Sequence, residues 1–142
     1  ERAVAVVLIG EDRQDVSRRM PAGKPLLRAR IEPRMPGALA AVRVLGFAGI
    51  GRPEKFRATL EAAGAEIAGF RGFADHHRYG ARVLARMAGA ADRERAMLVT
   101  TEKDQVRLPP EWRGRVRAVP VAVRWQDEHA VDAMLARLRR DG

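Results

Sequence analysis

Three short apolar runs, each followed by a segment with helical periodicity, constrain the fold of this chain more than any other feature. The runs cover residues 43–48, 66–73 and 96–100, and each ends in glycine or polar residues. Strands that alternate with helices form a mostly parallel sheet between helical layers. We therefore predict an α/β fold of the three-layer α/β/α, Rossmann-like class.

The connections that follow these three strands are predicted to lie close together. Right-handed crossovers bring the carboxyl ends of parallel strands to the same edge of a sheet, which is where open α/β sheets usually carry their chemistry. The connections that should meet there span residues 49–52, 74–78 and 100–104.

Helix boundaries can be placed from proline and glycine. Pro53 suits the first position of a helix, and Gly64 suits the residue that follows its end. The next helix carries Tyr79 on its apolar face and should break at Gly89. A last helix, over about 129–140, has a clear apolar stripe.

The other strand-like segments differ in character. Residues 3–10 are almost continuously apolar and predict a buried strand, which suits either the start of a domain or a fragment of a longer chain. Residues 25–33 and 116–125 alternate apolar and basic side chains, as half-exposed strands do, and Pro120 indicates an edge position or a bulge. We expect these two segments to form an antiparallel pair outside the parallel sheet.

Composition narrows the class of protein. A length of 142 residues with 46% hydrophobic side chains suits one ordinary domain, and there is no cysteine, no signal-peptide pattern and no apolar run long enough to span a membrane. We therefore expect an intracellular protein without disulfides. The formal charge of +9 favours phosphates or anionic lipids as partners. The arginines are dispersed and accompany no recognition motif, so nucleic-acid binding is not expected.

The turn that contains Gly49, Gly51 and Arg52 is a candidate anion site. Glycine lets the backbone approach an anion closely, and the start of the next helix offers free N–H groups and a positive dipole end. A tight strand-to-helix turn needs glycine for its own geometry, and the full dinucleotide-binding pattern is absent because Phe56 stands at the next small position. Both interpretations remain open.

Asp75, His76 and His77 are the residues best suited to proton transfer near neutral pH. A carboxylate beside an imidazole can hold its tautomer and raise its basicity, which suits a general base. The alternative is a polar surface loop. Adjacent histidines seldom point at one ion and no further histidine lies near in sequence, so no metal site is expected.

The segment after the third strand concentrates polar groups. This segment has two hydroxyls, two carboxylates and an ammonium in five consecutive residues, which could orient a sugar or bind a cation: Thr100, Thr101, Glu102, Lys103 and Asp104. A charged loop that caps the following segment explains the same pattern equally well. The chain contains neither a P-loop nor a Gly-x-Ser-x-Gly motif, and its one serine is Ser17, so nucleotide binding in a P-loop and serine hydrolysis are excluded.

Three motifs, in this order and at these spacings, closely resemble the tetraacyldisaccharide 4′-kinase (lipid A 4′-kinase) family. The motifs are FAGIGRPEKF, FADHH and LVTTEKD, and VVLIGEDR and VRAVPVAVRW are also similar to that family. The resemblance covers nearly all of this chain, but only about the C-terminal half of a family member. The family's N-terminal P-loop domain, with its magnesium carboxylates, is not among these residues.

The resemblance implies an activity, its cofactors and its partners. Family members transfer the γ-phosphoryl group of ATP, with Mg²⁺, to the 4′-hydroxyl of a tetraacyldisaccharide 1-phosphate at the cytoplasmic face of the inner membrane. Residues 1–142 would be the C-terminal α/β domain, and residues 25–33 and 116–125 would be the strands that link it to the N-terminal kinase domain. ATP and Mg²⁺ would be bound mainly by that other domain, so this chain alone is expected to be inactive.

The resemblance also implies residue roles. The catalytic pair Asp75 and His76 matches the family's Asp-His motif, and His76 would be part of the base that deprotonates the sugar hydroxyl, paired with an aspartate from the other domain. His77 and the matching residues of the other two motifs would contact the substrate or shape the cleft. The alternatives are a non-catalytic α/β module that binds a phosphosugar or an anionic lipid, and a basic nucleic-acid-binding domain.

Overall fold

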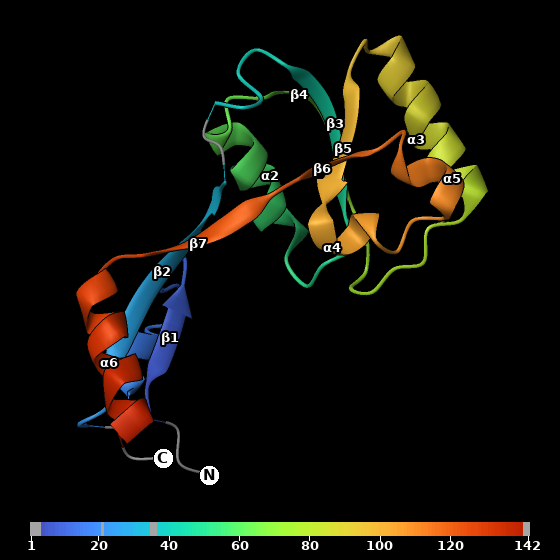
Figure 1. The fold of residues 1–142 in the computed structure, drawn as a ribbon. Coiled ribbons are helices and arrows are strands. Elements are labelled where there is room, and N and C mark those ends of the chain that lie inside the picture. Colours follow the sequence, from blue (N-terminus) through green and yellow to red (C-terminus); the bar gives the residue numbers. More distant parts are fainter. Residues whose placement is uncertain (1–3, 21, 35–36, 141–142) are drawn as a thin grey trace. The chain divides into compact units, whose positions relative to one another are not determined.

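The computed structural model describes residues 4–20, 22–34 and 37–140 of the chain (Figure 1). The chain divides into two compact units, one formed by Pro33–Val121 and the other by Glu1–Glu32 together with Ala122–Gly142. We call the first the central unit and the second, which takes residues from both ends of the chain, the split unit. Within the described residues, no helix has the length and apolar character that a membrane span requires.

The central unit is built on a parallel sheet in the order β4-β3-β5-β6. The strands are β3 (Arg43–Ala48), β4 (Glu66–Gly72), β5 (Met97–Thr101) and β6 (Arg117–Val119), and every pair of neighbours runs parallel. The connections carry α2 (Pro53–Ala62), α3 (Ala81–Arg93), α4 (Glu102–Gln105) and α5 (Pro110–Arg113). The mostly parallel α/β sheet predicted from the sequence is therefore confirmed.

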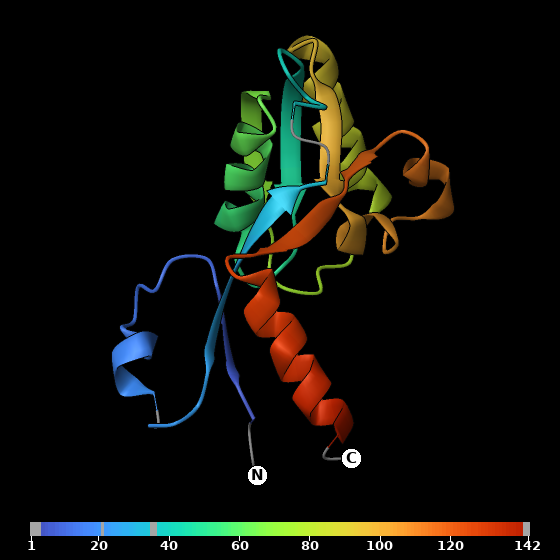
Figure 2. The ribbon, with the colours of Figure 1, turned by 60° about the vertical axis from the view of Figure 1, so that its left-hand side comes forward.

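Alternate residues of the strands supply two separate apolar clusters. Phe47 and Leu98 pack in a cluster with residues of α3 and α5, whereas their neighbours Ala48 and Val99 pack in a cluster with residues of α2. Successive strand residues point to opposite faces of a sheet, so each cluster fills one face. Figure 2 shows α2 and α3 on opposite sides of the strands accordingly.

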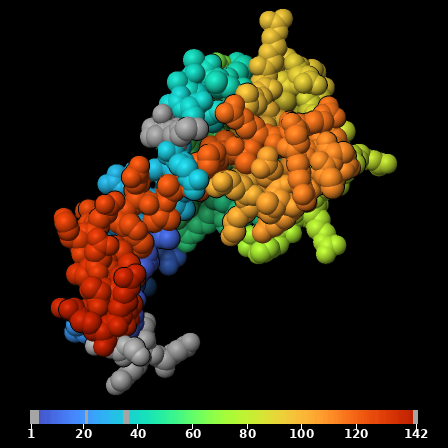
Figure 3. Space-filling model, in the orientation of Figure 1, coloured from blue at the N-terminus to red at the C-terminus, as the bar shows by residue number. Residues whose placement is uncertain are grey.

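The segment between β5 and β6 closes one of these clusters. In Figure 3 its amber and orange atoms cover the centre and right of the front of the central unit. Beneath this surface, Leu108, Trp112 and Val116 are only 1%, 6% and 2% exposed. The short helices α4 and α5 thus return the chain to the sheet while adding apolar side chains to its core.

The sequence correctly predicts the ends of α2 but not the end of α3. Pro53 begins α2, and Gly64, with φ of +81°, follows its end as predicted. The predicted break at Gly89 is wrong, because α3 continues through it to Arg93. Burial of Leu84, Met87 and Ala91 on one face of α3 offsets the cost of about 1 kcal/mol that a glycine imposes on a helix interior.

The split unit contains a three-stranded mixed sheet in the order β1-β2-β7. Its elements are β1 (Val6–Ile9), α1 (Val16–Arg19), β2 (Leu26–Pro33), β7 (Val121–Trp125) and α6 (Glu128–Arg140). The last residue of β2 and the first residue of β7 are assigned to the central unit. β1 runs parallel to β2. Hydrogen bonds from Gln126 N to Arg28 O and from Arg34 N to Pro120 O show that β7 runs antiparallel to β2, as expected.

Two strand predictions need correction. The segment 116–125 is not one strand, because Pro120 divides it into β6, which joins the parallel sheet, and β7, which pairs with β2. Proline has no N–H for a ladder, so the chain changes sheets there. The predicted buried strand at 3–10 is also wrong where it is described: β1 is an edge strand, and its burial alternates between half-buried and exposed.

Candidate active site

The loops after β3, β4 and β5 meet at one end of the central sheet, as predicted. Figure 1 shows the connections to α2 and α3 and the short helix α4 at this end. Gly49 N donates a hydrogen bond to Asp104 Oδ2 at 3.1 Å, and His76 N donates to Gly49 O at 3.1 Å. Through Gly49, the first loop is therefore bonded to both of the others.

Asp104 is the centre of this loop cluster. Its side chain is fully buried, and it accepts hydrogen bonds from Gly49 N, from Thr101 Oγ1 at 2.6 Å and from Tyr79 Oη at 2.9 Å. Thr101 Oγ1 also accepts a bond from Asp104 N, which caps the start of α4. A buried carboxylate with three donors stabilises the site internally and offers no free surface to a ligand.

Gly49 is required by a close approach rather than by an anion. A Cβ atom at this position would lie 2.7 Å from Tyr79 Oη and 3.2 Å from Ala74 O. Its backbone N–H donates to Asp104 and is therefore not free to bind an anion. A Cβ at Gly51, by contrast, would meet no atom within 4 Å. The tight-turn interpretation of Gly49 is therefore the one this geometry favours.

His76 presents its ring to solvent at the edge of the cluster. Its side chain is 74% exposed, and its backbone has a positive φ of 59°. Its N–H bonds to Gly49 O and to Asp75 Oδ1, the latter at 3.0 Å, which orders the backbone at this point. The ring Nε2 lies 3.7 Å from Asp75 Oδ2, and Nδ1 lies 3.0 Å from Nη2 of Arg107. The base candidate is thus accessible and held by its neighbours.

His77 turns away from its neighbour and into the protein. Its ring stacks on Phe73 with centroids 4.5 Å apart and meets Tyr79 edge-on at 5.0 Å. Its Nε2 is buried without a hydrogen-bond partner. His77 therefore supports the loop by packing, and the two adjacent imidazoles do not converge. Among the described residues, no group of three or more His, Asp or Glu side chains could hold a metal ion.

The remaining predicted residues lie around this cluster on the surface. Arg52 is exposed at the start of α2, and Glu102 and Lys103 are exposed in the first turn of α4. Arg52 follows β3, and Glu102 and Lys103 follow β5, whereas His76 lies in the loop after β4. Their exposure leaves these charges accessible to a ligand.

Sequence patterns did not identify two residues of this cluster. Tyr79 was assigned to the apolar face of a helix, but α3 begins two residues later, and the Tyr79 hydroxyl reaches Asp104 instead. Burial and the bond to Asp104 raise the pKa of Tyr79 far above its ordinary value. Arg107 lies three residues beyond Asp104, and its Nη1 lies 3.3 Å from Gly49 O and 3.6 Å from Asp104 Oδ1. No sequence pattern singled it out among the many arginines.

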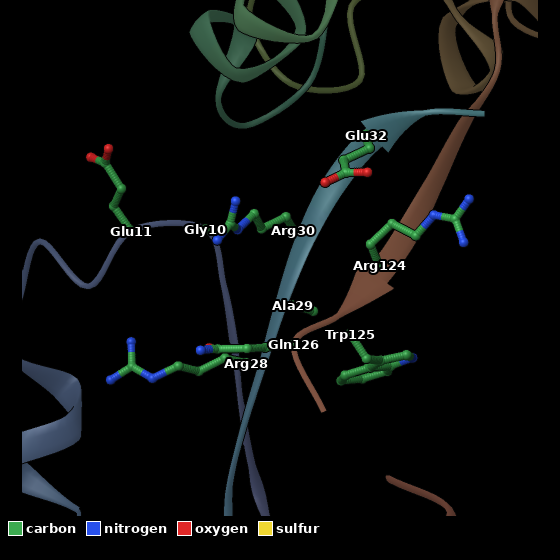
Figure 4. Close-up of a pocket in the computed structure, with 9 residues that line it drawn as sticks. All are labelled: Gly10, Glu11, Arg28, Ala29, Arg30, Glu32, Arg124, Trp125 and Gln126. Carbon is green, nitrogen blue, oxygen red and sulfur yellow. The ribbon is translucent and has the colours of Figure 1, made fainter. Parts of the chain in front are cut away.

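A separate pocket of about 650 Å³ lies in the split unit (Figure 4). It is lined by three arginines, Arg28, Arg30 and Arg124, with Glu11, Glu32, Trp125 and three further residues. Arg28 and Arg30 extend from β2 to one side, whereas Arg124 extends away from them to the other. Because the three guanidinium groups do not converge, this pocket is not built to bind one anion. None of the predicted site residues lines it.

The chain is similar to enzymes named tetraacyldisaccharide 4'-kinase. The chain is 45% identical over 139 residues to the tetraacyldisaccharide 4'-kinase of Rhodospirillum centenum, covering 96% of this chain and 41% of that protein. It is 52% identical over 109 residues to the enzyme of the same name from Methylobacterium radiotolerans, covering 77% of this chain and 33% of that protein. The chain therefore spans about two fifths or less of the length of these relatives.

A solved structure shares the fold. The crystal structure of LpxK from Aquifex aeolicus, described as a complex with ATP, aligns with a TM-score of 0.53 and 21% identity over 92% of this chain and 42% of that chain. The family model for tetraacyldisaccharide-1-P 4'-kinase matches residues 1–139. The order of motifs, the α/β architecture and these matches lead to one assignment: the chain belongs to the tetraacyldisaccharide-1-P 4'-kinase family.

Proposed function

We propose that this chain supplies the acceptor side of a lipid kinase, which transfers the γ-phosphoryl group of ATP to the 4′-hydroxyl of a tetraacyldisaccharide 1-phosphate. Family membership supports the reaction. The observation that carries the proposal is the exposed ring of His76, held at the carboxyl ends of the parallel strands by loops that bond to one another.

His76 is proposed as the general base. A sugar hydroxyl is a weak nucleophile, and a positioned base contributes on the order of 10²–10⁴-fold to such a reaction. In the proposed step the hydroxyl proton passes to the His76 ring as the oxygen bonds to the γ-phosphorus and the bond to the leaving ADP breaks. Asp75 lies beside the ring, with its Oδ2 3.7 Å from His76 Nε2.

The other predicted residues divide into two proposed groups. Gly49, Thr101, Asp104 and His77 are buried or bonded within the loop cluster, and we assign them to its architecture. The exposed charges of Arg52, Glu102 and Lys103, with Gly51 in the open turn, are proposed to contact the substrate. A cationic side chain such as Arg52 suits a lipid that already carries a phosphate.

ATP and Mg²⁺ chemistry does not fit the residues described. The sequence has no P-loop, and no carboxylate or imidazole cluster among the described residues suits a metal ion. We assign the binding of ATP and Mg²⁺ to the portion of the longer relatives that this chain does not span. That portion would be the partner of the loop cluster, and this chain alone would show no kinase activity.

The formal charge of +9 supports a further part of the proposal. A basic surface is attracted to the anionic leaflet of a membrane, and the lipid substrate resides in such a membrane. We therefore propose that the protein works in the cytoplasm, on the inner-membrane surface.

A chimera provides the test of function. This chain would replace the matching 41% of the Rhodospirillum centenum relative, and the transfer of labelled phosphate from ATP to the lipid disaccharide would be measured. His76→Ala should lower kcat by on the order of 10²–10⁴-fold. His129→Ala, which alters an exposed histidine of α6, serves as the matched control. An undiminished rate for His76→Ala would refute the assignment of the base.

A further inference from the structure

Arg107 joins the three loops of the cluster to the His76 ring. One guanidinium nitrogen, Nη1, lies 3.3 Å from Gly49 O and 3.6 Å from the buried carboxylate of Asp104. The other, Nη2, lies 3.0 Å from Nδ1 of His76. The Arg107 side chain is 25% exposed and His76 is 74% exposed, so a partly buried cation contacts an accessible ring.

The chemistry of this contact determines the tautomer of His76. A guanidinium group is always protonated and has no acceptor atom, so it can only donate. His76 Nδ1 must therefore be the acceptor, with its lone pair directed at Arg107 Nη2. In a neutral imidazole one nitrogen carries the proton and the other does not. The proton of the neutral ring consequently lies on Nε2.

The other side of the ring agrees with this tautomer. Nε2 lies 3.7 Å from Asp75 Oδ2, so its N–H faces a carboxylate, which favours a donor at that nitrogen. A cation on one side and an anion on the other thus favour the same proton position. Without Arg107, only Asp75 would select between the two tautomers.

We infer that Arg107 is a positioning residue for His76: it holds the ring as the Nε2–H tautomer and so keeps Nδ1 as the nitrogen that accepts the proton of the substrate. This inference rests on the proposed role of His76 as a base. The sugar hydroxyl replaces the Arg107 N–H at Nδ1, while the contact of Nη1 with Gly49 O retains the guanidinium in the cluster.

The tautomer can be observed directly, without any kinase assay. The chain has three histidines, so ¹⁵N-labelled protein gives few ring signals, and two-bond ¹H–¹⁵N correlations distinguish Nε2–H from Nδ1–H rings. We expect the neutral His76 ring to show the Nε2–H pattern. In Arg107→Met the Nδ1–H form should become appreciably populated. A His76 pattern identical in Arg107→Met and the unaltered protein would overturn the inference.

Arg113→Met is the matched control. Arg113 belongs to the same connection between β5 and β6 and also bonds to backbone carbonyls, at 3.0 Å to Leu108 O and 2.9 Å to Val106 O, but it does not contact His76. It should leave the His76 tautomer unchanged. A tautomer change in Arg113→Met equal to that in Arg107→Met would indicate general loosening of the connection and would also overturn the inference.

Kinetics of the chimera supply the second readout. Arg107→Met should lower kcat on the order of 10-fold to 100-fold, with KM for the lipid nearly unchanged, because the group affected is the base rather than a binding contact. A larger KM with unchanged kcat would overturn the positioning role. The two hypotheses can be refuted separately. Full activity of the His76→Ala chimera would refute the role of His76 as the base. An unchanged His76 tautomer in Arg107→Met would refute only the positioning role of Arg107.

Discussion

The central and split units bury the apolar side chains of their strands to very different extents. In the central unit, residues such as Val44, Phe47 and Val99 are completely buried in two clusters. In the described part of the split unit, only Leu27 and Ala29 are buried, at 4% and 3% exposed, and α6 contains no buried residue. The candidate active site lies on the central unit, so its loops follow strands whose side chains are packed in a buried core.

This difference shows that an apolar run predicts a strand more reliably than it predicts burial. A run is buried when helices cover both faces of its sheet, as they cover β3 and β5. β1 has a comparable sequence, yet it forms the edge of a three-stranded sheet, and its Val7 is 46% exposed. Burial therefore depends on the neighbours that the fold supplies.

The strongest test of this comparison removes one large side chain from each unit. Phe47→Ala should destabilise the central unit by about 3–5 kcal/mol, because it leaves a cavity in a closed core. Leu135→Ala, in the 44% exposed position of α6, should cost less than about 1 kcal/mol in the split unit. Denaturant unfolding, followed by tryptophan fluorescence, measures both changes.

The two tryptophans allow each unit to be followed separately. Trp112 lies in the central unit and Trp125 in the split unit, so a Trp125→Phe background reports the former and a Trp112→Phe background reports the latter. Equal losses of stability for Phe47→Ala and Leu135→Ala would contradict the comparison.

A second test compares two glycines of one loop. Gly49→Ala should destabilise the central unit by about 1–3 kcal/mol, because its Cβ must displace Tyr79 Oη or the Ala74 carbonyl. Gly51→Ala should be neutral or stabilising by up to about 1 kcal/mol, because the new methyl group meets open space and the unfolded chain loses freedom. Denaturant unfolding in the Trp125→Phe background measures both, and equal effects would contradict the close packing at Gly49.

A third test uses pH. Burial, with the hydrogen bond to Asp104, raises the pKa of Tyr79, so the folded state holds the phenolic proton more tightly than the unfolded chain, whose value is 10.0. The resulting contribution to stability is complete below pH 10 and is lost as the pH rises, because the unfolded chain then ionises while the folded state does not. Tyr79→Phe should remove this part of the pH dependence.

The chain contains one tyrosine, so tyrosinate absorbance reports Tyr79 alone. We expect the folded protein to show little absorbance of this kind at about pH 11, and the protein unfolded in denaturant at the same pH to show it fully. A tyrosinate signal that rises around pH 10 in folded protein would contradict the buried pair with Asp104.

The smallest expected effect concerns the adjacent histidines. Because His77 Nε2 is buried without a hydrogen-bond partner and the ring stacks on Phe73, His77→Phe should change the free energy of unfolding by less than about 1 kcal/mol, toward greater stability. The measurement is denaturant unfolding at neutral pH. A loss of more than about 1 kcal/mol would indicate a polar role for His77 that the packing does not show.

Much of the candidate site could be predicted because the rule of right-handed crossovers places loop ends from the order of elements alone. The sequence predicted that Gly49, His76 and Asp104 would approach one another, and hydrogen bonds now join their loops. The sequence could not predict that the Asp104 carboxylate would be buried and the His76 imidazole exposed. Each side chain's direction depends on local backbone angles, such as the positive φ of His76, that residue patterns do not reveal.

The amino-acid sequence by itself determined the alternation of strands and helices, the start of α2 at Pro53, the family and the edge of the sheet where polar residues gather. Only the tertiary structure decided which strands share a sheet, that Gly89 lies inside a helix, and that Arg107 reaches His76. The physical reason is one of range. Local patterns set backbone preferences over a few residues, whereas burial and side-chain partners depend on contacts between segments far apart in the chain.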